Sequence, residues 1–235
     1  MTMDKVSVYT ISLLDNILKN LIKNNESHIH ISTNLRKGVP LENINKIAGP
    51  FAEAWLQEKI ENICLHPNEY IFSDYEGGAR LDFYDIKFHL KNEAIGVDRD
   101  IFIDTKSAAL DIPTSGLGSN LTSYIRIRNL YLKDSSLRFI IAALKHRVTQ
   151  SPSGLIIEGF NVFDLMYVAD KELSFNKTMG SQLQIRDSKQ VTLEDRTAGQ
   201  FIKMIDRKYI ASLGKDNWKI LAKKHGWNLT DINNL

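Results

Sequence analysis

The sequence predicts a mixed α/β domain in which a central mixed β-sheet is flanked by helices. Residues 5–23 carry apolar side chains at near-helical spacing, and the chain from about residue 193 onward is again mostly helical in pattern. Between them, residues 81–90 and 101–105 are rich in β-branched and aromatic residues, which is typical of strands. The order of helices, strands and helices favours one sheet covered by helices.

The N-terminal part is predicted to hold two helical regions. The first, residues 5–23, has one apolar stripe and is therefore amphipathic. A second helix is expected to begin at Pro40, because proline is favoured at helix starts. The pair Gly49-Pro50 should break this helix and restart it, so that residues 50–64 form a new one.

The middle of the chain reads as strands and loops. The stretch 107–120, rich in Gly, Ser and Pro, is expected to be a loop after the strand 101–105. Residues 137–148 are apolar enough for a central strand, although a buried helix fits nearly as well. Residues 154–170 resemble paired strands, and 173–181 form a polar loop. The C-terminal helical region should break at Gly214.

Composition limits the class of protein. The chain of 235 residues is 43% hydrophobic and 25% charged, as expected for a globular protein with a substantial core. It has no apolar run near the roughly 18 residues that span a bilayer, no signal-peptide pattern at its start, and one cysteine, Cys64. We therefore expect a cytoplasmic protein that has no internal disulfide and does not associate with membranes.

Charge is unevenly distributed along the chain. Residues 1–112 hold 12 Lys and Arg against 17 Asp and Glu, whereas residues 113–235 hold 18 against 11. An acidic half beside a basic half suits a protein that holds a cation in one place and phosphates in another, and ordinary scatter of surface charge is the alternative.

Charged residues stand at the two ends of the segment 80–107. Asp104 and Lys106 are two apart on the second predicted strand, so their side chains share a face. Asp82 begins the first predicted strand, and in an antiparallel pair it would lie near Asp104. Two carboxylates brought together repel each other unless a cation joins them, and Mg²⁺ commonly uses one or two carboxylates plus phosphate oxygens. Lys106 could orient an attacking water and offset charge on the phosphorus, which predicts metal-assisted phosphodiester hydrolysis.

Two further acids accompany this group. Glu53 falls in the first turn of the helix expected to start at Pro50. It could hold a second ion there, or it could be an ordinary acid at a helix start, where the helix dipole favours negative charge. Asp85 is the alternative to Asp82, but it would point to the opposite face of the strand. We favour Asp82 on position and strand parity.

These residues together resemble the PD-(D/E)xK nuclease superfamily. Its motif is an acid at the start of one strand, then an acid, any residue and Lys at the end of the next. Here the motif reads Asp82, Asp104 and Lys106, with Glu53 as the helical acid, while Leu81 stands in place of Pro. Within the superfamily, "GLGSNLTSYIRIRN" (116–129) and "FNKTMGSQLQIRDSKQV" are similar to segments of EcoRV-like type II restriction endonucleases.

The resemblance implies a restriction-endonuclease-like fold and a homodimer that binds and cuts double-stranded DNA. The cofactor would be Mg²⁺, with Mn²⁺ as a substitute, and no nucleotide cofactor is expected. The loop 174–181 would enter the major groove, and the 116–129 segment would lie on the sugar–phosphate backbone. The implied groove contacts are Ser174, Asn176, Lys177, Thr178 and Ser181, and the implied backbone contacts are Thr122, Ser123, Tyr124 and Arg126.

We therefore expect a single domain over residues 1–235. Residues 1–40 would supply an N-terminal helix and a possible dimerisation arm, 41–192 the catalytic core with the recognition loop, and 193–235 the C-terminal helices. The predicted activity is site-specific cleavage at a short palindrome, leaving 5′-phosphate ends. A structure-directed repair or junction nuclease, and a non-catalytic DNA-binding protein with a vestigial site, are the alternatives.

Overall fold

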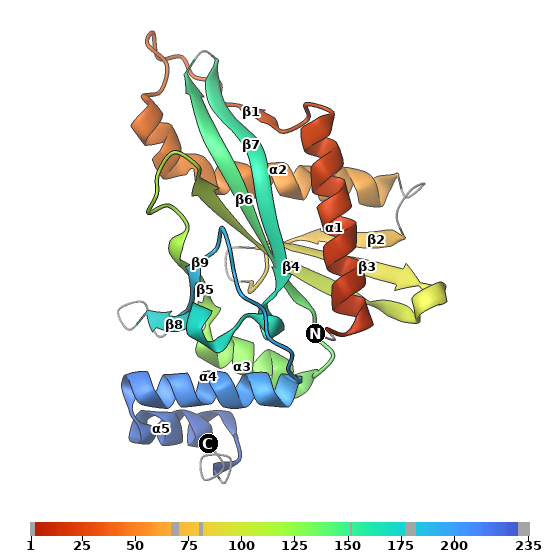
Figure 1. Cartoon of the computed structure of the whole chain (residues 1–235), viewed down its shortest axis with the longest axis vertical. Coiled ribbons are helices and arrows are strands. Elements are labelled where there is room, and N and C mark those ends of the chain that lie inside the picture. Colours follow the sequence, from red (N-terminus) through yellow and green to blue (C-terminus); the bar gives the residue numbers. More distant parts are fainter. Residues whose placement is uncertain (1–2, 67–70, 80–81, 151, 177–181, 230–235) are drawn as a thin grey trace.

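The computed structural model describes residues 3–66, 71–79, 82–150, 152–176 and 182–229, and its strands form two sheets (Figure 1). The larger sheet has the order β1-β7-β6-β4-β3-β2, and only the β4–β6 pair is parallel. The smaller sheet is antiparallel, with the order β5-β9-β8. The strands are β1 (His28–His30), β2 (Phe72–Gly77), β3 (Ile86–Asn92), β4 (Val97–Ala109), β5 (Leu117–Ser123), β6 (Phe139–Gln150), β7 (Ser153–Asp164), β8 (Leu173–Asn176) and β9 (Gln182–Asp187).

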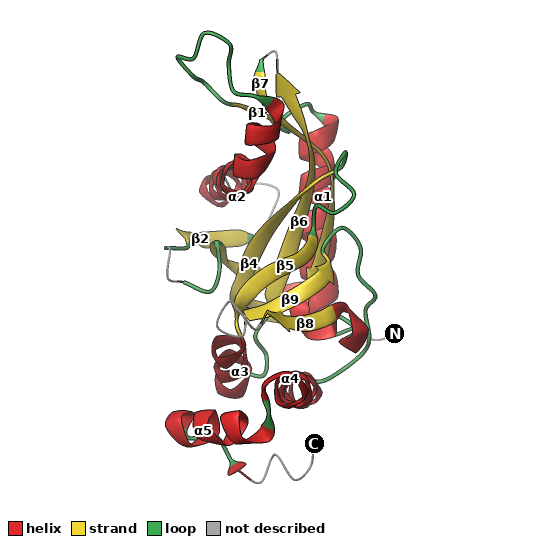
Figure 2. Cartoon of the chain, turned by 90° about the vertical axis from the view of Figure 1, so that its left-hand side faces the viewer, coloured by secondary structure: helices red, strands yellow, loops and turns green. Residues whose placement is uncertain are grey.

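The helices gather at two ends of the molecule. Helices α1 (Lys5–Lys23) and α2 (Leu41–Leu65) pack against the larger sheet, whereas α3 (Tyr124–Lys133), α4 (Ala198–Leu213) and α5 (Lys215–His225) cluster beyond the smaller one (Figure 2). Short 3₁₀ turns are η1 (Glu93–Ile95), η2 (Leu165–Tyr167) and η3 (Asp170–Glu172). Each group of helices buries its own apolar cluster against strands, so the predicted mixed α/β fold is confirmed.

Helix α1 matches its prediction. Asp4 caps it by accepting hydrogen bonds from the backbone amides of Val6 and Ser7, at 2.7 and 3.3 Å. The apolar stripe, which includes Leu14 and Leu18, is buried against the larger sheet. Core packing therefore accounts for this stripe.

The expected break at Gly49-Pro50 is wrong, because α2 runs without interruption through Pro50. Proline removes one helical hydrogen bond and costs roughly 3 kcal/mol inside a helix. Apolar side chains on one face of α2 are buried both before and after the proline, including Ala48 and Trp55, and their packing holds the two segments in line.

The strand boundaries also differ from the predictions. Strand β3 begins at Ile86, so residues 82–85 precede it, and β4 continues to Ala109, inside the predicted loop. The segment 154–170 is one strand followed by 3₁₀ turns, and the first part of the predicted loop 173–181 is β8. Residues 137–148 are the central strand β6, which excludes the buried helix. The break at Gly214, whose φ of 94° favours glycine, is confirmed.

Among the described residues, no helix combines the length and the apolar character needed to cross a membrane.

Candidate active site

The site lies where β4 passes between β3 and β6, at the centre of the larger sheet. The side chains of Asp104 and Lys106 leave β4 on one face, as predicted from their spacing, and line the same cavity. Asp104 is only 7% exposed, and Lys106 Nζ donates a hydrogen bond of 2.6 Å to its Oδ1. The two residues therefore form a nearly buried ion pair.

The first acid beside this pair is Asp85. Its carboxylate Oδ2 accepts a hydrogen bond of 2.6 Å from the amide of Thr105, directly between Asp104 and Lys106. Its own amide donates to the carbonyl of Ile103 at 2.8 Å, which extends the β3–β4 ladder by one residue. Asp85 is therefore fixed against β4 by both its backbone and its side chain.

Two further contacts hold the segment that carries Asp85. Its carbonyl accepts hydrogen bonds from Gln57 Nε2 on α2, at 2.9 Å, and from the amide of Gly78, at 2.7 Å. A Cβ atom at Gly78 would lie 1.9 Å from the carbonyl oxygen of Tyr84, so only glycine permits this close approach.

Asp82 is placed differently from the prediction. Residues 82–85 are not part of a strand, so the parity argument that favoured Asp82 over Asp85 does not apply. The Asp82 carboxylate accepts a hydrogen bond of 2.7 Å from the amide of Ala79 and closes a turn. Asp82 and Asp85 both line the cavity that contains Asp104, and Asp85 is the acid whose carboxylate is hydrogen-bonded to β4 beside Asp104.

The electrostatics of the site follow from burial and close charges. Burial raises the pKa of Asp104 to about 6, against the opposing effect of the Lys106 ammonium, and Asp85 raises it further. Burial by itself would lower the pKa of Lys106, but Asp104 reverses this and the pKa is raised. Burial and then Asp85 raise the pKa of Glu53, which places Glu53 within electrostatic reach of the pair, in the interior of α2 and not in a first turn.

The donor atoms fit a hard divalent cation such as Mg²⁺. Asp104 Oδ2 is buried and has no hydrogen-bond partner among the described residues, which is costly for a carboxylate oxygen. Asp85 and Asp104 offer two carboxylates, the number that Mg²⁺ commonly takes from a protein when phosphate and water complete its shell. Within the described ranges no three His, Cys, Asp or Glu side chains converge as a ready-made metal cluster.

A cavity of about 360 Å³ opens over these residues. The side chains of Thr122, Ser123 and Arg126 form its opposite wall, at the junction of β5 and α3. Ser123 caps α3, and Arg126 donates a hydrogen bond of 3.1 Å to the carbonyl of Asp82. Three of the four residues predicted to contact the sugar–phosphate backbone of DNA therefore line one cavity with Asp82, Asp104 and Lys106.

Tyr124 is the exception and corrects the prediction, because it is fully buried. Its hydroxyl donates to the carboxylate of Asp206 and accepts a hydrogen bond of 2.9 Å from Trp218 Nε1. Arg128, also fully buried, donates to the same carboxylate at 2.9 Å, and its guanidinium lies 4.0 Å from the ring centroid of Trp227. Tyr124 and Arg128 therefore join α3 to α4 and α5 and are closed to DNA.

The predicted recognition loop is only partly described. Ser174 is exposed on β8, and Asn176 donates a hydrogen bond of 3.3 Å to Asn120 Oδ1 on β5. Lys177, Thr178 and Ser181 lie outside the described residues.

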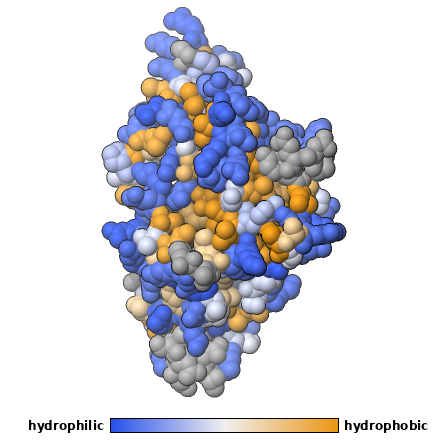
Figure 3. Space-filling view, turned by 45° about the vertical axis from the view of Figure 1, so that its right-hand side comes forward, coloured by the Kyte–Doolittle hydropathy of each residue, from blue (hydrophilic) through white to orange (hydrophobic). Residues whose placement is uncertain are grey.

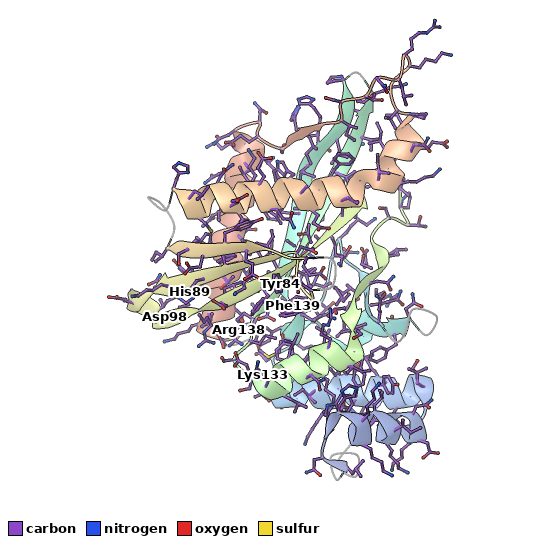
Figure 4. The ribbon with its side chains drawn as sticks, turned by 180° about the vertical axis from the view of Figure 1, so that it is seen from behind. Tyr84, His89, Asp98, Lys133, Arg138 and Phe139 are labelled. Atoms are coloured by element: carbon purple, nitrogen blue, oxygen red, sulfur yellow. The ribbon has the colours of Figure 1, made fainter. Side chains whose placement is uncertain are left out.

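The histidines lie apart from this cavity. His89 and Asp98 lie on the β3–β4 hairpin (Figure 4), and the two ring nitrogens of His89 contact Asp98 and Asp100 at 2.8 and 3.1 Å. Hydrogen bonding to Asp100 raises the pKa of His89. His28 and His30 lie on β1 and line a separate cavity with Trp55.

Sequence reasoning missed several residues of the cavity. Asn120 and Gln182 line it from β5 and β9, and Gln57 holds the carbonyl of Asp85 from α2. Neutral amides at strand ends carry little signal in a single sequence. A strand start placed at Ile86 would have pointed to Asp85, which immediately precedes it.

Comparisons with known proteins give consistent matches over most of the chain. Residues 2–226 match the family model described as "Type II restriction endonuclease HpaI". The "Type II restriction enzyme HpaI" of Haemophilus parainfluenzae is 39% identical over 201 residues, which are 80% of this chain and 78% of that protein. Among solved structures, the "NlaIV restriction endonuclease" superposes with a TM-score of 0.50 and 12% identity over 89% of this chain and 88% of that chain, a likeness of fold.

Proposed function

The chain belongs to the HpaI family of type II restriction endonucleases, and we propose that it hydrolyses DNA in the cavity above Asp104 and Lys106. It is thus a site-specific deoxyribonuclease, and the family selects this activity over a structure-directed nuclease or a vestigial DNA-binding protein. The observation that carries the placement is the buried Asp104 carboxylate, with one oxygen on Lys106 and the other without a partner among the described residues.

Asp85 and Asp104 are the side chains proposed to hold the metal ion. A bound Mg²⁺, or Mn²⁺ in its place, would supply Lewis-acid stabilisation of the phosphate and a more acidic water. The hydrogen bond from Thr105 to Asp85 and the ion pair of Asp104 fix both carboxylates before any ligand arrives, which limits the reorganisation needed on binding. Glu53 is proposed to support a second ion or an outer-shell water.

Lys106 is proposed to act beside the reacting phosphate. Its ammonium is held by Asp104 and remains charged because its pKa is raised, so it can offset the negative charge that develops on the phosphate oxygens. It can also donate a hydrogen bond to the attacking water and orient it in line with the leaving 3′ oxygen. Because the bond from phosphorus to the 3′ oxygen breaks, the phosphate stays on the 5′ side and the product carries a 5′-phosphate.

The opposite wall is proposed to hold the sugar–phosphate backbone. Thr122 and Ser123 offer hydroxyls, and Arg126 offers a guanidinium with donors left after its bond to the Asp82 carbonyl. Asp82 then has a positioning role, because its carbonyl orients Arg126 and its carboxylate closes the turn before Asp85.

A homodimer is proposed because a two-fold axis lets each subunit cut one strand of a palindromic site. Apolar side chains gather over the middle of one face of the molecule, framed by hydrophilic ones (Figure 3), and such a surface suits burial by a second copy. The compartment proposed is the cytoplasm, because the enzyme acts on DNA inside the cell.

The test is a plasmid digest in Mg²⁺ followed by sequencing of the fragment ends. Discrete fragments with one common end sequence and 5′-phosphates are the expected result, with Mn²⁺ supporting cleavage and a chelator stopping it. Cleavage at unrelated sequences, or undiminished cleavage in the chelator, would contradict the proposal.

A further inference from the structure

The smaller sheet has two faces of opposite character. One face is apolar and buried against α3 and α4, through side chains that include Leu183 and Ile185. The other face is lined by alternate residues of the same strands, because neighbouring side chains on a strand point to opposite sides. It carries five uncharged polar side chains, which we call the carboxamide face: Asn120, Ser174, Asn176, Gln182 and Gln184.

The strand register brings these side chains together. Asn176 pairs with Gln182, and Gln184 pairs with Ser174 on one side and Asn120 on the other. Asn176 donates to Asn120 across the sheet at 3.3 Å, and Gln184 donates to the carbonyl of Gly118 at 3.0 Å. The amides are thus held in an ordered row.

Gln182 is the member whose hydrogen bonding is incomplete. Its Oε1 is buried and has no partner among the described residues. A buried amide oxygen without a donor is costly, so a ligand that brings an N–H group would bind there with a gain. Because an amide carries a donor beside its acceptor, the complementary ligand offers an N–H group next to an acceptor.

The carboxamide face is continuous with the active-site cavity. Asn120 and Gln182 line that cavity together with Lys106 and Arg126. A strip meant for phosphates would carry Lys or Arg, but the first charge along this face of β9 is Arg186, two residues beyond Gln184. A nucleotide whose phosphate lies beside the Lys106 ammonium would therefore place its neighbouring bases against amides.

We propose that the carboxamide face, with Gln182 at its catalytic end, reads the major-groove edge of an adenine next to the scissile phosphate. Adenine offers the N6 amino group as a donor and N7 as an acceptor, the pattern that one Gln or Asn amide can bind with both its atoms. The inference rests on the proposed function and deepens it, because it assigns part of the sequence specificity to side chains of β5, β8 and β9.

The test compares two DNA duplexes and several variants. Once fragment ends have given the recognition sequence, each adenine next to the cut is replaced by 7-deazaadenine, which still pairs with thymine but lacks the N7 acceptor. The wild-type enzyme should lose about 5- to 100-fold in kcat/KM on the modified duplex. Gln182→Leu and Gln182→Glu, which lack the amide donor, should cut both duplexes at the same reduced rate.

Gln190→Leu is the matched control, because Gln190 is an exposed glutamine outside the carboxamide face, and it should keep the wild-type ratio. A purely structural role of Gln182 would lower both rates and preserve the ratio, which would overturn the inference, as would a cut site without a neighbouring adenine. The ratio of the affinities for the unmodified and the 7-deazaadenine duplex, measured by DNA binding without metal, separates the reading of adenine from the proposed cleavage activity. Discrimination in binding without any cleavage would support the reading of adenine and contradict only the proposed function.

Discussion

The raised pKa of Asp104 predicts a particular link between pH and metal. Protonation of Asp104 removes a metal ligand, so at low Mg²⁺ the cleavage rate should fall about tenfold for each pH unit below about 6. Because Mg²⁺ and the proton compete for the same carboxylate, raising the Mg²⁺ concentration should move the midpoint to lower pH. Single-turnover cleavage between pH 4.5 and 8, at two Mg²⁺ concentrations, measures both effects.

The same pKa has a consequence for stability. The folded-state pKa of about 6 lies above the ordinary value of 3.8, so the folded protein binds the proton more tightly than the unfolded chain. Ionisation of Asp104 therefore costs the metal-free protein about 3 kcal/mol of stability, a cost that develops as pH rises from about 4 to 6. Mg²⁺ should raise the melting temperature clearly at pH 8 and little at pH 4.5.

Asp82→Asn is the control for both measurements, because its carboxylate closes a turn at the rim of the cavity. This variant should keep the wild-type pH midpoint and the wild-type response to Mg²⁺. A midpoint that stays fixed as Mg²⁺ varies, or Mg²⁺ stabilisation of equal size at both pH values, would refute the role given to Asp104.

Three further variants test other parts of the site and its support. Lys106→Ala should reduce cleavage at least ~100-fold while leaving DNA binding in place, as measured by single-turnover kinetics and gel shift; retained cleavage would contradict its role. Arg126→Ala should weaken DNA binding and reduce the slope of log K against log salt by about one, whereas Tyr124→Phe should lower the melting temperature and leave that slope unchanged; a changed slope in the second variant would place Tyr124 on DNA. Asp206→Ala removes the carboxylate that pairs with the buried Arg128 guanidinium and should cost about 3–5 kcal/mol in denaturant unfolding. A loss below 1 kcal/mol would show that the pair is not a structural anchor.

Much of the fold was predictable because periodicity marks long elements well. Helix α1 follows its apolar stripe, and β6 follows its continuous apolar run, since a strand at the centre of a sheet is buried on both faces. At Pro50 the prediction was wrong, because local propensity favours a break whereas packing on both sides of the proline maintains one helix.

The site was predictable in part for a related reason. Asp104 and Lys106 stand two apart on one strand, so their shared face follows from strand geometry without tertiary information. The choice between Asp82 and Asp85 depended on where β3 begins, and strand boundaries are the least certain part of a sequence pattern.

Tyr124 shows a different limit of sequence reasoning. A tyrosine beside Ser123 and Arg126 has the composition of a DNA-contacting segment, but Ser123 begins a helix there and directs the next side chain into the core. The partners Asp206 and Trp218, which account for its burial, lie more than 80 residues away and cannot be paired with it from one sequence.

Cleavage is expected to depend on two acids, Asp85 and Asp104, which are held beside Lys106. The most direct test is the single-turnover cleavage rate of Asp85→Asn beside that of Asp82→Asn, at saturating Mg²⁺ on the same duplex. We predict that Asp85→Asn loses at least ~100-fold, while Asp82→Asn stays within about tenfold of the wild-type rate because its carboxylate only closes a turn. The reverse order, with Asp82→Asn inactive and Asp85→Asn active, would show that Asp82 and not Asp85 is the acid that cleavage requires.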